Sequence, residues 1–178
     1  VHYDIRNLKR YGRRVNWEIL SERHEVSISE KDFTQFLTKD WNFQHLSTHP
    51  KLSLSFEILR QTLTRNWDWK ALTRRKDLKL NKSLLLAQQI EEGEIKNVKE
   101  WEWIKNIDWD WNHLSNERWL DGELLKAFHD KEWDWKTISE NQAITFDLSL
   151  LQLITTKENV NWSAIIKNPN THINSNTL

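Results

Sequence analysis

The chain has 178 residues, with 26 Lys and Arg against 26 Asp and Glu, so its formal net charge is zero. It contains no cysteine, three glycines and two prolines, which excludes disulfides, cysteine-ligated metals and glycine-rich phosphate loops. A mean hydropathy of −0.79 and the absence of a long apolar run or a signal-peptide pattern argue against a membrane protein and predict a cytoplasmic one.

Twelve Trp residues stand out, and most of them recur in a three-residue motif that we call the Trp motif. It consists of an aromatic or aliphatic residue, then Asn or Asp, then an aromatic residue. The copies are Val15–Trp17, Trp41–Phe43, Trp67–Trp69, Trp109–Trp111, Trp133–Trp135 and Val160–Trp162. An aliphatic residue follows three positions later, and a Ser or Thr comes next in five of the six copies. Self-similarity at about 20 to 50 residues is typical of stacked repeat proteins.

The Trp motif predicts the start of a helix, because its central Asn or Asp is a favoured N-cap. The residue before the cap and the fourth residue after it then form a hydrophobic staple, which pairs Trp67 with Leu72 and Trp133 with Ile138. A second set of cap residues follows at similar offsets and predicts a second helix in each repeat. These residues are Ser29, Ser55, Asn81, Asp121, Thr145 and Asn174. We expect about two turns in the first helix and about three in the second.

Helices this short are unstable alone, so each repeat must pack on its neighbours. The sequence therefore predicts an all-α fold, an α-solenoid of about six helix–helix repeats of roughly 26 residues, forming one domain over 1–178. The repeats start near residues 15, 41, 67, 109, 133 and 160. The third repeat is longer, and residues 88–108 are either a decayed repeat or an insertion that lengthens its second helix. The chain starts with Val and stops before the last helix could be complete, so we expect a longer parent protein.

No catalytic or metal site is predicted. His45 and His49 are four residues apart, but no carboxylate-rich motif accompanies them. The exchange of Asp for Asn in the Trp motif suits capping and not acid–base catalysis. The recurring Ser and Thr residues are expected to satisfy carbonyls at the end of the first helix. We therefore expect no enzyme activity, no cofactor and no small-molecule ligand.

The Trp motifs resemble short Trp-rich repeats of large bacterial and giant-virus proteins, in which Trp-Asp-Trp precedes an aliphatic–Ser pair. The resemblance covers residues 15 to about 174. The alternation of a short and a longer helix is also similar in architecture to leucine-rich repeat variant arrays. Neither resemblance implies an established activity. Both imply an interaction scaffold within a larger protein.

The preferred functional hypothesis is a non-catalytic scaffold that binds a protein or a neighbouring domain of the same chain. We expect its contacts at the variable residues just after the first helix of each repeat, because these residues differ in charge from one repeat to the next. The six candidates are Arg23, His49, Arg75, Glu117, Asn141 and Asn168.

The alternative hypothesis is a nucleic-acid-binding solenoid. Residues 65–82 carry seven basic residues against Asp68 and Asp77, a net charge of +5. A basic strip beside aromatic residues can follow phosphates and stack on bases. Its residues are Arg65, Lys70, Arg74, Arg75, Lys76, Lys79 and Lys82. A solvated face is the simpler interpretation, because the Trp residues are expected in the core.

Overall fold

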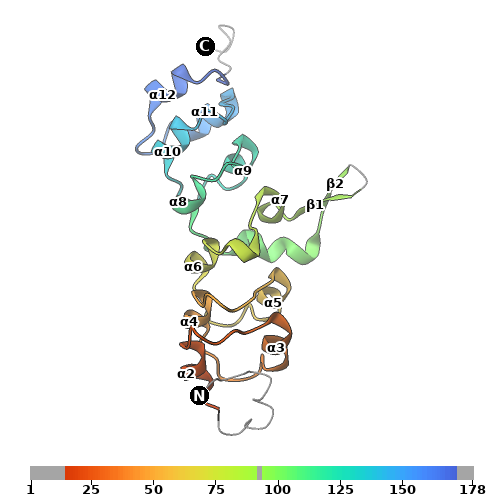
Figure 1. The fold of residues 1–178 in the computed structure, drawn as a ribbon. Coiled ribbons are helices and arrows are strands. Elements are labelled where there is room, and N and C mark those ends of the chain that lie inside the picture. Colours follow the sequence, from red (N-terminus) through yellow and green to blue (C-terminus); the bar gives the residue numbers. More distant parts are fainter. Residues whose placement is uncertain (1–14, 92–93, 172–178) are drawn as a thin grey trace. The chain divides into compact units, whose positions relative to one another are not determined.

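The computed structural model describes residues 15–91 and 94–171 (Figure 1). Residues 1–79 and 80–178 form two compact units, here called the first and second unit. The boundary falls inside the third repeat. No helix in the described part of the chain is long and apolar enough to cross a bilayer.

The described part of the first unit is built from short helices. They are α2 (Trp17–Ser21), α3 (Glu30–Gln35), α4 (Phe43–Ser47), α5 (Phe56–Gln61), α6 (Trp69–Thr73) and the 3-10 helix η2 (Lys76–Leu78). The first helices of successive repeats contact each other, α2 with α4 and α4 with α6. Figure 1 shows α3 and α5 following one another on the opposite side of this unit.

The second unit adds a small β-hairpin to its helices. Its elements are α7 (Lys82–Leu85), β1 (Gln88–Glu91), β2 (Glu94–Asn97), the 3-10 helix η3 (Lys99–Asn106), α8 (Trp111–Leu114), α9 (Gly122–Ala127), α10 (Trp135–Glu140), α11 (Leu148–Ile154) and α12 (Trp162–Lys167). The first helices α10 and α12 contact each other, as do the second helices α9 and α11. The predicted helical class is thus confirmed for the described residues outside the hairpin.

All six helix starts predicted from the Trp motif are confirmed. In each motif the central Asn or Asp accepts a hydrogen bond from the backbone N–H three residues later. Ser29, Ser55, Asn81 and Asp121 cap the second helices in the same way. The predicted cap Asn174 lies outside the described residues.

The predicted cap at Thr145 is wrong, because Asp147 caps α11 instead. Asp147 lies 13 residues after the first cap Asp134, which is the cap-to-cap spacing of the first three repeats. The shift places Phe146 just before the cap, where its side chain is fully buried. A cap at Thr145 would have put the polar Ser149 at the staple position, where the other repeats have an apolar residue. This mismatch in the sequence pointed against Thr145 as the cap.

The second helices are shorter than predicted, at four to seven residues. The Trp that opens the next motif explains this in α3, α5 and α9, because its indole N–H bonds to the C-cap residue. The four indole bonds all span five residues. They join Trp41 to Phe36 O (2.9 Å), Trp67 to Thr62 Oγ1 (3.0 Å), Trp109 to Ile104 O (3.0 Å) and Trp133 to Phe128 O (2.8 Å).

Aromatic rings also join successive repeats. The last aromatic residue of one Trp motif meets the first Trp of the next motif edge-on. Ring centroids are 4.8 Å apart for Trp17 and Trp41, 4.9 Å for Phe43 and Trp67, and 5.0 Å for Trp111 and Trp133. All six rings are buried, so they form the core between repeats.

The recurring hydroxyl residues have a second function that the sequence did not suggest. Ser47 Oγ donates to Phe43 O at 2.8 Å, as expected for the end of a helix. The same oxygen accepts the backbone N–H of Asp68, the cap of the next repeat, at 2.9 Å. Equivalent bonds join Ser21 to Asn42, Ser115 to Asp134 and Ser139 to Asn161. Each of these four hydroxyls therefore connects two repeats.

Residues 88–108 do not lengthen the second helix of the third repeat, because α7 ends at Leu85. Strands β1 and β2 pair antiparallel, with Gln88 opposite Asn97. The helix η3 follows and contains Trp101 and Trp103. Its Ile104 carbonyl accepts the indole N–H of Trp109, so η3 takes the place that a second helix has before the other Trp motifs.

Candidate interaction surface

The six predicted partner-binding residues do not share one environment. Arg23 is exposed, and Glu117 and Asn141 are half-buried. His49 and Asn168 are buried, and the side chain of Arg75 is 11% exposed. The expectation that all six lie on an open surface is therefore wrong for His49, Arg75 and Asn168.

These three side chains are buried because they bond to the backbone of the preceding repeat. His49 Nε2 lies 3.1 Å from Arg23 O, and Arg75 donates to His49 O at 3.0 Å. Asn168 donates to Asn141 O at 3.2 Å. Each acceptor is the residue at the same position one repeat earlier. Side chains at this position therefore form a series of hydrogen bonds, each to a backbone carbonyl of the preceding repeat, which we call the carbonyl ladder. His, Arg and Asn can all act as the donor in it.

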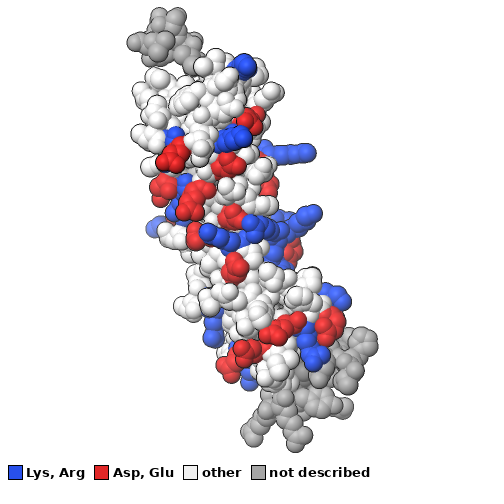
Figure 2. Space-filling view, turned by 90° about the vertical axis from the view of Figure 1, so that its left-hand side faces the viewer, with Lys and Arg blue, Asp and Glu red and all other residues white. Residues whose placement is uncertain are grey.

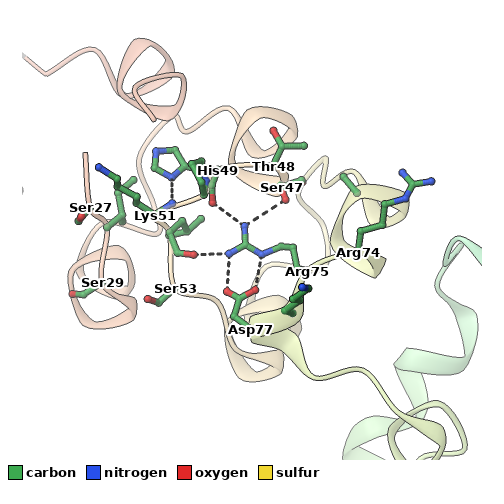
Figure 3. Close-up of a pocket in the computed structure, with 15 residues that line it drawn as sticks. Ser27, Ser29, Ser47, Thr48, His49, Lys51, Ser53, Arg74, Arg75 and Asp77 are labelled. Atoms are coloured by element: carbon green, nitrogen blue, oxygen red, sulfur yellow. Dashed lines mark hydrogen bonds and ion pairs between the residues drawn. The ribbon is translucent and has the colours of Figure 1, made fainter. Parts of the chain in front are cut away.

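Arg75 makes the largest number of these contacts (Figure 3). Besides His49 O, its guanidinium reaches Leu52 O at 2.5 Å and Ser47 O at 3.5 Å. It also forms a two-pronged ion pair with Asp77, at 3.0 and 2.7 Å. Burial alone would raise the pKa of Asp77, but the Arg75 hydrogen bonds and charge outweigh it and lower that pKa.

An open groove of about 770 Å³ surrounds Arg75 in the first unit. Residues 27–29, 47–53 and 74–77, together with Ala71, form its walls. Two of these segments run side by side, because Ile28 and Leu52 form a parallel bridge. The bonds are Ile28 N to Lys51 O at 2.8 Å and Ser53 N to Ile28 O at 3.0 Å. The groove thus lies over the segments that connect the first and second helices within three successive repeats.

The basic strip of residues 65–82 is divided between the two units, with Lys82 in the second. The Arg75 guanidinium donates hydrogen bonds within the carbonyl ladder. The Lys82 ammonium forms ion pairs with the carboxylates of Asp121 and Glu123, each at 2.5 Å. The Arg65 guanidinium lies over the Phe43 ring, 5.4 Å from its centroid. Lys70, Arg74, Lys76 and Lys79 are exposed. Figure 2 shows acidic and basic side chains interspersed on the face it presents.

His49 supplies a pH-dependent contribution to stability. Its Nδ1 accepts from Lys51 N at 3.2 Å, so the proton lies on Nε2 and is donated to Arg23 O. Burial of the ring is the main cause that lowers the pKa of His49 below its ordinary value of about 6.5. The nearby charges of His24 and Arg75 act in the same direction. The folded state therefore favours the neutral ring.

We expect the free energy of unfolding to fall as the pH drops below about 6.5, because the unfolded chain then binds a proton that the folded chain resists. The contribution is present above the unfolded pKa and is lost as the pH falls through the folded one. Urea unfolding at several pH values measures it. His49→Gln should remove this acid-dependent part, whereas His45→Gln, an exposed site in the same unit, should retain it. An unchanged pH profile in His49→Gln would contradict the assignment.

Residues 15–91 and 94–171 contain no group of three or more His, Asp and Glu side chains placed to hold a metal ion. Comparisons with protein-family models, with curated proteins and with solved structures found no match to this chain.

Proposed function

We propose that the chain is a non-catalytic protein-interaction module whose repeats stack as an α-solenoid. The recurring polar residues serve as caps, inter-repeat hydroxyls and the carbonyl ladder, so they support a structural use and not a catalytic one. The partner is a protein surface or a neighbouring domain of the same chain. Of the six predicted contact residues, Arg23, Glu117 and Asn141 remain candidates.

The observation that carries this proposal is the apolar face of α12. Trp162 is 41% exposed, although the residues at its position in the first, second, fourth and fifth repeats are at most 7% exposed. Those residues are Trp17, Phe43, Trp111 and Trp135. Trp69, in the irregular third repeat, is half-buried. An exposed Trp on a helix face is typical of a protein-binding site.

Ile166 extends this face, because it lies one helical turn after Trp162 and is 71% exposed. It stands where the other five repeats have Ser or Thr. In four of them that hydroxyl accepts a backbone N–H from the next repeat. The α12 face thus has the position of an inter-repeat contact, but its chemistry favours an apolar partner side chain.

Ile166→Glu tests the proposal, because a charge placed against an apolar partner surface is costly. In quantitative pull-downs, proteins captured by the unaltered chain should be depleted about tenfold or more with Ile166→Glu. Ile19→Glu is the matched control, since Ile19 is also an exposed isoleucine, 49% accessible, on a first helix. It should retain the same partners. Thermal melts must show that both variants stay folded. Equal capture by all three proteins would overturn the proposal.

A further inference from the structure

We propose that the groove around Arg75 binds an extended acidic peptide segment of a partner protein. This inference names a partner class for the proposed interaction module and depends on that function. It concerns the first unit and uses none of the residues of the α12 face.

The charge of the groove is the first argument. Its lining contains Lys51, Arg74, Arg75 and Lys76 against the single carboxylate of Asp77, a net charge of +3. Asp77 is held by Arg75 in the two-pronged ion pair, so the two charges compensate each other locally. The lining His49 is held neutral by burial near pH 7. The positive charge that faces solvent therefore comes from Lys51, Arg74 and Lys76, which are all exposed.

The polar groups of the groove suit carboxylates. The Lys51 ammonium donates to Glu25 O at 3.2 Å, which occupies one of its three donor hydrogens. Figure 3 shows Arg74 extending away from Arg75, so we assign the main contacts to Lys51 and Lys76. The exposed hydroxyl residues Ser27 and Ser53 lie along the same walls. Ammonium and hydroxyl groups are the donors that carboxylate oxygens accept from.

The shape and composition favour a peptide over a single-stranded nucleic acid. The groove follows the parallel-bridged segments at Ile28 and Leu52, which suits an extended chain. Its described lining residues include no Trp, Tyr or Phe, so no aromatic ring is available for the base stacking that supports such binding.

The experiment measures fluorescence anisotropy of a labelled oligoglutamate peptide with the full chain at low salt. The matched oligoglutamine peptide and an oligothymidylate serve as comparison probes. Oligoglutamate should bind, and oligoglutamine should not. Binding should weaken about tenfold with the double variant Lys51→Glu, Lys76→Glu, and it should weaken as salt is raised. Lys39→Glu, an exposed lysine of the first unit outside the groove, should change affinity much less.

Two patterns of binding would overturn the inference. One is oligoglutamate binding that Lys39→Glu and the double variant weaken equally, because this would show unspecific attraction. The other is tighter binding of oligothymidylate that the double variant abolishes, because the groove would then be a nucleic-acid site. A failure to bind oligoglutamate, with partner capture still lost in Ile166→Glu, would reject the acidic peptide and leave the proposed function standing.

Discussion

Trp133→Ala is expected to lower the free energy of unfolding by about 3–5 kcal/mol, as large-to-small changes of core aromatic residues do. Trp133 is 5% exposed and contacts the Trp111 ring edge-on. Its indole N–H also bonds to Phe128 O, which is buried at the end of α9. The substitution therefore removes a packed ring between two repeats and leaves a carbonyl without its donor. Urea unfolding followed by circular dichroism measures the loss.

Trp133→Phe separates the two contributions. Phenylalanine retains an aromatic ring at the Trp111 contact but cannot donate to Phe128 O. We expect it to cost about 1–3 kcal/mol, of which the unpaired buried carbonyl is a main part. A loss under about 1 kcal/mol in Trp133→Ala would contradict the assignment of this side chain to the core.

Arg75→Ala is the second substitution with a large expected effect. The substitution removes the hydrogen-bond donor to three backbone carbonyls of the preceding repeat. It also leaves the Asp77 carboxylate without its ion-pair partner. Unsatisfied buried acceptors and a broken charged hydrogen bond together predict a loss of about 2–4 kcal/mol in the free energy of unfolding. Thermal and urea unfolding of the full chain measure it.

Arg74→Ala is the matched control, because Arg74 is the adjacent arginine and is exposed. We expect a change within about 0.5 kcal/mol there. Arg75→Lys should recover part of the loss, since an ammonium keeps the charge but cannot form the two-pronged contact with Asp77. Equal stability of Arg75→Ala and Arg74→Ala would return Arg75 to the set of surface contact residues that the sequence predicts.

Local chemistry made the helix starts predictable. An N-cap such as Asn16 or Asp134 bonds to an N–H three residues away, so a short sequence window contains both partners. The same holds for the bond from Ser47 to Phe43 O, four residues earlier. These features explain why the helical class and the six first caps followed from the amino-acid pattern alone.

The function of the candidate binding positions was decided by tertiary structure. His49, Arg75 and Asn168 bond to backbone carbonyls about one repeat away. The residue type at this position differs from repeat to repeat, which is also typical of positions on a protein surface. A backbone carbonyl has no sequence signature, so any donor of suitable length can take this place. The second partner of Ser47, the Asp68 N–H, was hidden for the same reason.

The starts of the six first helices could be predicted from the sequence, because each cap bonds to a backbone N–H only three residues away. Tertiary structure decided which caps and which polar side chains were used. Asp147, and not Thr145, caps α11, and the Phe146 side chain just before this cap is buried. The Arg75 guanidinium is surrounded by backbone carbonyls of the preceding repeat. The exposure of Trp162 and Ile166 was likewise decided at this level. Burial depends on which repeats pack together, and those contacts join residues about twenty or more positions apart.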